Sequence, residues 1–131
     1  MLAASASLAG LTLMGPEAEA ADRFALTCMQ NKTNLTLNYK TKWGDGQWQT
    51  HRIVPGGKRW HAWEYQRGQE GRSPWLHVAF DDDLSGRAKH RTYRLASYAS
   101  PQQGNCQRYG KQHQFRYDGT AKKYIDLVVV D

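Results

Sequence analysis

Hydrophobic side chains recur at every second position along most of the chain after residue 20, and no segment shows a helical face. The clearest example is the stretch 35–43. Its apolar and polar residues fall on opposite sides of an extended chain: Leu35, Leu37, Tyr39 and Trp43 against Asn38, Lys40 and Lys42. Because successive side chains of a strand point to opposite faces, this pattern predicts a strand with one buried and one solvated face, as in antiparallel sheets.

Turn residues divide the chain into about eight such segments, which is typical of an all-β fold. The expected strands are 24–30, 35–43, 48–54, 59–65, 75–80, 90–99, 112–118 and 124–130. Gly44-Asp45-Gly46 predicts a hairpin between the second and the third. Both alternate faces of the last segment are apolar, so we expect it to be a central strand covered on both sides. The fold expected is an antiparallel β-sandwich with one disulfide, with a small barrel as the alternative.

Residues 1–20 have the pattern of a signal peptide. An apolar, small-residue run is followed by Gly15-Pro16 and by Ala18-Glu19-Ala20, an A-x-A cleavage pattern. No Lys or Arg precedes the apolar run, which departs from the usual charged beginning of a signal. No segment approaches the roughly 20 apolar residues that a spanning helix needs. We therefore expect one domain, residues 21–131, exported to the periplasm or the cell exterior, with no membrane span.

The chain is basic, with 18 Lys and Arg against 12 Asp and Glu. Removal of residues 1–20 takes away two of the acidic residues, Glu17 and Glu19, and raises the formal net charge from +6 to +8. Such a charge favours anionic partners, because the summed field concentrates them near the surface. It also serves simple solubility, and the sequence favours neither explanation.

Cys28 and Cys106 are the only cysteines in the sequence. An even number in an exported chain predicts a disulfide rather than a metal site. The bond would join the first predicted strand to a loop near the end of the domain. Closing so long a loop is worth about 4 to 5 kcal/mol in the chain-entropy model. Reduction is therefore expected to lower the melting temperature.

The stretch Asp81-Asp82-Asp83-Leu84-Ser85-Gly86 has the spacing of a calcium loop. Asp81, Asp83 and Ser85 would be the ligands. Thr92 stands where a helix-loop-helix site needs a bidentate Glu, and several cations lie close by. An acidic turn between two strands explains the same residues and is the interpretation favoured.

No catalytic residue is assigned from the sequence. The five histidines are scattered, without the spacing of a metal site, and there is no nucleophile elbow and no phosphate-binding Gly loop. A glycosidase needs two facing carboxyl groups, and Glu64 with one of the Asp81–Asp83 residues could form such a pair. We therefore expect the protein not to be an enzyme, with a hydrolase as a distant alternative.

Aromatic residues give the better indication of function, since five Trp and seven Tyr exceed what a small core needs. Exposed rings can stack on sugars while neighbouring cations bind carboxylates, sulfates or phosphates. The candidate binding residues are Trp60, Trp63, Trp75 and His77, with Lys58, Arg59, Arg94 and Arg116 as cationic support. The competing explanation is that these tryptophans are partly buried and the cations merely solvated.

Strand and turn residues also carry a resemblance. They are Cys28-Met-Gln-Asn31-Lys-Thr33, Tyr39, Trp43, Gly46, Trp48 and Pro55-Gly56, and later Ser73-Pro74, Phe80-Asp81, Gly110-Lys111, Phe115 and Tyr124-Ile125-Asp126-Leu127. In this order the chain resembles small exported bacterial β-domains of unknown function. The resemblance implies a fold and a compartment and supplies no catalytic residue.

Together these features predict a non-catalytic exported binding module for anionic or carbohydrate polymers of the cell envelope. A module that binds, assembles with or inhibits an envelope protein is the first alternative. Nucleic acid fits the charge, but export and the lack of a nucleic-acid-binding motif argue against it. The sequence does not fix the oligomeric state.

Overall fold

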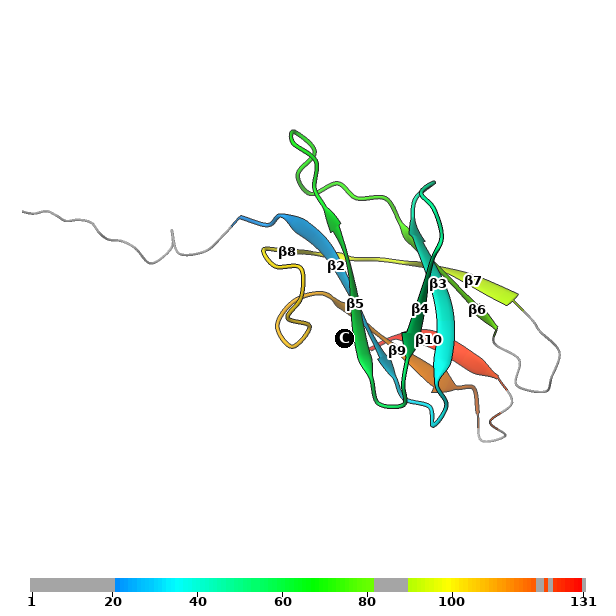
Figure 1. Ribbon diagram of the computed structural model, residues 1–131. Helices are drawn as coiled ribbons and strands as arrows, with labels where there is room; N and C mark the ends of the chain where they lie inside the picture. Colours follow the sequence, from blue (N-terminus) through cyan, green and yellow to red (C-terminus); the bar gives the residue numbers. More distant parts are fainter. Residues whose placement is uncertain (1–20, 82–89, 120–121, 123, 131) are drawn as a thin grey trace, which may run out of the picture.

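The structure is a computed structural model that describes residues 21–81, 90–119, 122 and 124–130. The described residues form nine strands and no helix. One sheet contains β2 (Phe24–Asn31), β5 (Lys58–Glu64), β8 (Tyr98–Ser100), β9 (Lys111–Tyr117) and β10 (Ile125–Val129). The other contains β3 (Leu37–Trp43), β4 (Gln49–Ile53), β6 (Leu76–Asp81) and β7 (His90–Leu95). The two sheets pack face to face (Figure 1), so the predicted β-sandwich is confirmed.

Strand β2 is the centre of the five-stranded sheet. It pairs with β5 along one edge, and its other edge is shared by β8 and β9, in the order β10-β9-β2-β5 with β8 beside β2. The β2–β9 pair is parallel and the others are antiparallel. Residues 24–29 are all buried, which shows that this strand is covered on both sides.

The four-stranded sheet has the order β4-β3-β6-β7, and every pair in it is antiparallel. Strands β3 and β4 form the predicted hairpin. In β3 buried and exposed residues alternate from Leu37 to Thr41, so one face of this sheet is buried and the other is solvated.

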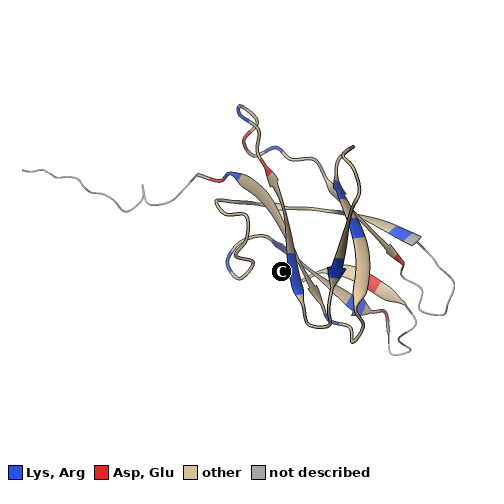
Figure 2. Cartoon of the chain, in the orientation of Figure 1, with Lys and Arg blue, Asp and Glu red and all other residues tan. Residues whose placement is uncertain are grey.

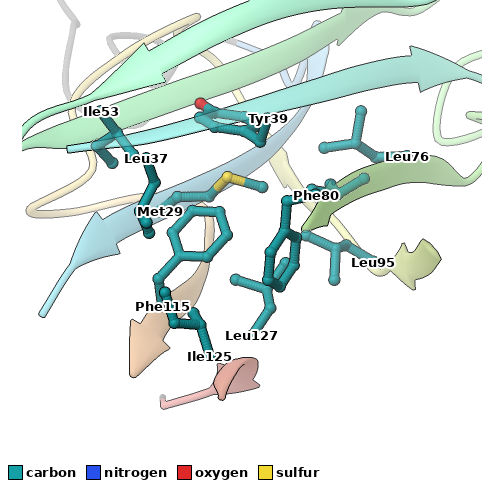
Figure 3. Close-up of a cluster of buried hydrophobic side chains, with 11 residues drawn as sticks. Met29, Leu37, Tyr39, Ile53, Leu76, Phe80, Leu95, Phe115, Ile125 and Leu127 are labelled. Carbon is teal, nitrogen blue, oxygen red and sulfur yellow. The ribbon is translucent and has the colours of Figure 1, made fainter. Parts of the chain in front are cut away.

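The core lies between the sheets (Figure 3). It combines Met29, Phe115, Ile125 and Leu127 of the five-stranded sheet with Leu37, Tyr39, Ile53, Leu76, Val78, Phe80 and Leu95 of the four-stranded sheet. Phe115 joins the layers, because its ring centroid lies 5.4 Å from that of Tyr39 and 5.1 Å from that of Phe80.

The side chain of Asn31 holds the chain where it passes from one sheet to the other. It is fully buried, and its Nδ2 donates to the carbonyls of Leu35 and Ile53 at 2.6 and 3.0 Å. Its Oδ1 accepts from the backbone N–H and the hydroxyl of Thr33 at 2.9 and 2.7 Å. All the donors and acceptors of this buried amide are thereby used, as burial of a polar group requires.

Segment 101–110 lies over the outer side of the five-stranded sheet. The predicted disulfide, Cys28–Cys106, is present and fixes this segment to β2. Gly110 approaches so closely that a Cβ there would lie 2.6 Å from the sulfur of Cys28 and 3.0 Å from Leu26 Cγ. We call this side of the sandwich the covered face.

Two details differ from the sequence prediction. The single strand expected over 90–99 is two strands in different sheets, because the chain crosses between the layers at Ala96 and Ser97, where the hydroxyl of Thr27 donates to the Ala96 carbonyl. The central position expected for 124–130 is wrong, because β10 is an edge strand. Ile125 and Leu127 fill the core, whereas Val129 on the same strand is 55% exposed.

Candidate binding face

Three cationic or imidazole side chains lie in one row across the outer side of the four-stranded sheet. Lys42 of β3 is the register partner of His77 of β6, which is also the register partner of Arg94 of β7. The row points outward because its neighbours Val78, Tyr93 and Leu95 face the core. We call this side of the sandwich the open face.

An exposed tryptophan stands beside each cation of the row. Trp48 immediately precedes β4, and the ammonium of Lys42 lies 4.9 Å from its ring centroid. Trp75 immediately precedes β6, and the Arg94 guanidinium lies 5.2 Å from its ring. Trp48 is 42% and Trp75 51% exposed. We call Trp48, Lys42, His77, Arg94 and Trp75 the aromatic–cationic row.

The cation–π contacts hold these long side chains in place before any ligand arrives. At exposed sites each contact is worth about 0.5–1 kcal/mol. A cation that is already positioned loses less rotamer freedom on binding. The exposed Arg94 still presents guanidinium N–H donors to solvent.

A shallow hollow of about 240 Å³ lies beside this row, in the middle of the open face. Its floor includes Ala79, whose small side chain leaves space between the strands. The polar side chains around it are Asn38, Lys40, Thr50 and Asp81. They provide both donors and acceptors for a hydroxyl-rich ligand.

Further cations extend the positive charge of this face. Lys40 and Arg52 are exposed and alternate with inward-facing residues of β3 and β4. Figure 2 shows Lys and Arg on both of these strands, while Asp81 at the end of β6 is the acidic residue that lines the hollow. The face can therefore attract an anion and also form hydrogen bonds with neutral hydroxyl groups.

The structure brings together three of the eight predicted binding residues. Trp75, His77 and Arg94 share the open face. Trp60 and Lys58 alternate with inward-facing residues on β5, so they lie on the covered-face side, where Trp60 is 47% exposed and passes close to Gly104.

The other three predicted residues lie apart from the open face. Arg116 is on the outer side of β9, where its Nε donates to Gln114 at 2.8 Å. Trp63 and Arg59 point between the sheets, and the Trp63 ring centroid is 6.0 Å from that of Trp43. The eight residues therefore do not form one patch.

Sequence reasoning missed Trp48 and Lys42 as site residues. The alternation placed Lys42 on the solvated side of its strand, but nothing in it indicated that β6 would lie beside β3. The hairpin was a usable signal. Continuing its register beyond Thr41–Gln49 sets Trp48 opposite Lys42.

Two histidines meet at the seam where β4 and β5 lie side by side. The ring centroids of His51 and His61 are 4.5 Å apart. His51 Nε2 shares a 2.7 Å hydrogen bond with the hydroxyl of Thr41, and His61 Nε2 shares one of 2.8 Å with the hydroxyl of Tyr39. Arg59 links β5 to β4 at this seam, since its Nε donates to the Arg52 carbonyl at 2.8 Å.

Burial determines the charge of this cluster. It lowers the pKa of His61 to about 3, with His51 and Arg59 adding repulsion, and burial followed by Arg59 lowers the pKa of His51. Burial also raises the pKa of Tyr39. The histidines are therefore neutral near pH 7 and act as hydrogen-bonding groups within the seam.

The predicted calcium ligands Asp83 and Ser85 lie outside the described residues, as does the predicted signal peptide. Asp81 is exposed at the end of β6. Within the described ranges no three His, Cys, Asp or Glu residues are grouped so that they could hold a metal ion. The same ranges contain no helix of the length and apolar character needed to cross a bilayer.

Comparison with protein-family models, curated proteins and solved structures gave no match for the chain. The roles of its residues are therefore inferred from their geometry.

Proposed function

We propose that the chain is a non-catalytic exported module that binds anionic polymers of the cell envelope on its open face. The observation that carries this proposal is the aromatic–cationic row, in which Lys42 and Arg94 flank His77 in one register and each contacts an exposed tryptophan.

The shape of the open face suits an extended ligand. Four strands at a spacing of about 4.8 Å give the row a length of roughly 14 Å. The adjoining hollow is shallow and continuous with the surface rather than an enclosed pocket. A polymer can contact several positions along such a row at once, so weak contacts add up without a deep cavity.

Removing two cations from one outer face, and in a second variant two from the other, tests the proposal. The double variant Lys42→Ala/Arg94→Ala removes two cations of the row, and Lys58→Ala/Arg116→Ala removes two outward cations of the other sheet. We expect the first to bind an immobilised polyuronate at least about tenfold more weakly, a loss of roughly 1.4 kcal/mol. The second should bind nearly as wild type does.

Equal losses in the two variants would contradict the proposal, because binding would then follow net charge alone. A neutral glucan serves as the ligand control. Thermal melting of each variant establishes that the fold is kept.

A further inference from the structure

The two tryptophans of the row are too far apart for one sugar ring to contact both. Trp48 flanks β4 and Trp75 flanks β6, with β3 between these strands. Trp75 is also displaced by two residues along its strand from the row position of His77. With strands about 4.8 Å apart and about 3.3 Å per residue, their backbone positions are separated by roughly 12 Å. Two directly linked sugar rings cannot span this distance, whereas two rings with one further sugar ring between them can.

The surface that adjoins the aromatic–cationic row on the side away from Trp75 offers groups that suit a hydroxyl-bearing chain. The next register row across the open face contains Thr50, Lys40, Ala79 and Thr92. Asn38 and Asp81, two residues further along β3 and β6, complete the rim of the hollow. Amide, hydroxyl and carboxylate groups exchange hydrogen bonds with sugar hydroxyls, which a polyphosphate lacks.

We propose that the ligand is an acidic glycan that crosses the strands of the open face, with one sugar ring against Trp48, another against Trp75 and its acid groups at Lys42 and Arg94. This inference rests on the proposed function and adds a ligand class, an orientation and a minimum length. Each cation lies beside a planar ring, as each acid group of such a chain lies beside the sugar ring that carries it.

The test uses oligogalacturonates of defined length, from two to eight units, titrated at low salt by calorimetry. We expect weak binding of the dimer, a rise in affinity of about tenfold or more at about three to four units, and little further gain per unit. A matched series of sulfated oligosaccharides distinguishes carboxylate from sulfate as the acid group preferred. A lipid-free polyphosphate and a single-stranded oligonucleotide of equal charge serve as competing anions and should bind more weakly.

Two variants connect the length step to the tryptophans. Trp48→Ala and Trp75→Ala should each lower the affinity of the long oligomers to near that of the dimer and abolish the step. Trp48→Phe and Trp75→Phe keep a ring and should keep part of it. Trp60→Ala removes an equally exposed ring on the covered-face side and should leave the step intact.

The outcomes separate this inference from the proposed function. One outcome is an affinity that rises smoothly with ligand charge and stays unchanged in both tryptophan variants, while Lys42→Ala/Arg94→Ala still weakens binding. That result overturns the proposed glycan geometry but agrees with binding on the open face. Equal or tighter binding of the polyphosphate or oligonucleotide overturns the ligand class. Failure of every anionic polymer to bind overturns the proposed function itself.

Discussion

The two outer faces of the sandwich are both formed by β-strands, but segment 101–110 lies over one of them and no described segment lies over the other. On the covered face the outward residues Phe24, Leu26 and Cys28 of β2 are apolar, and Leu26 and Cys28 are 0% and 1% exposed beneath segment 101–110. On the open face the outward residues of β3 are Asn38, Lys40 and Lys42, and no described segment covers them. A strand with two apolar sides requires a cover, since leaving them in water forfeits burial energy. A strand with one polar side leaves a surface available for binding.

The difference predicts that stability depends on the covered face and binding on the open face. Variants of the first should change unfolding far more than polymer affinity at temperatures where the protein stays folded. Variants of the second should do the reverse.

The largest effect is expected from the disulfide. Cys28 and Cys106 are separated by 78 positions, and opening so long a loop should lower the free energy of unfolding by about 4–5 kcal/mol in the chain-entropy model. Thermal melting with and without reductant measures this loss. Cys28→Ala/Cys106→Ala is the control, because reductant should not shift its melting temperature further. An unchanged melting temperature on reduction of the wild type would show that the covered face does not depend on this bond.

The next effect is expected from Gly110→Ala. The added Cβ would enter the space of the Cys28 sulfur, and Gly110 has a φ of +95° that L side chains rarely adopt. Together these should lower the free energy of unfolding by about 2–4 kcal/mol.

Gly68→Ala is the matched control, because its φ is +79° but nothing lies within 4 Å of an added Cβ. It should lose only the backbone part, about 1–2 kcal/mol. Urea unfolding compares the two variants. Equal losses would mean that segment 101–110 is not packed tightly on β2.

Acid should weaken the seam between the faces. Because the folded-state pKa of His61 is lowered to about 3, the unfolded chain binds more protons between that pH and the ordinary value of 6.5. The stability contributed by neutral His61 is therefore complete above about pH 6.5 and falls as the pH drops toward 3, by at most about 1.4 kcal/mol per pH unit. His51 acts in the same direction.

His61→Gln should flatten this dependence in urea unfolding measured from pH 7 to pH 4. His113→Gln is not a suitable control, because His113 is itself buried. The exposed Lys58→Gln serves instead and should leave the slope as it is. If the free energy of unfolding of His61→Gln depended on pH as steeply as that of the wild type, His61 would not be the group that makes the protein less stable in acid.

The smallest effect on stability is expected from the open face. Lys42→Ala/Arg94→Ala loses two exposed cation–π contacts and should change the free energy of unfolding by at most about 1 kcal/mol. The same variant should show the largest loss of polymer binding. If it unfolds as readily as Gly110→Ala does, the row is part of the scaffold rather than a binding surface.

Much of the fold could be predicted because it follows from local alternation. The two-residue period located seven of the eight expected strands within one or two residues, the exception being 90–99, and Gly44-Asp45-Gly46 identified the β3–β4 hairpin. The disulfide followed from the even number of cysteines together with the expected export. Position within a sheet did not follow, because it depends on which strands pair. The mostly apolar run of β10 resembled a central strand, whereas the strand covered on both sides is β2, whose outward cover is a distant segment.

The candidate site was predictable only in part for the same reason. Trp75, His77 and Arg94 were selected for their chemistry, and two of them meet because β6 pairs with β7. Trp60 and Trp63 had the same chemistry, but they point to opposite sides of β5, so neither joins the open face. Chemistry therefore indicated which residue types to seek, and strand pairing decided which of them share a surface.

The salt dependence of polyuronate affinity tests the binding role of the open face most directly. Each cation that neutralises an acid group of a linear polyanion adds to the slope of log affinity against log salt concentration. We predict that Lys42→Ala/Arg94→Ala lowers the magnitude of this slope by roughly one to two, while Lys58→Ala/Arg116→Ala leaves it near the wild-type value. Equal slopes in the two double variants would contradict the assignment of binding to the open face.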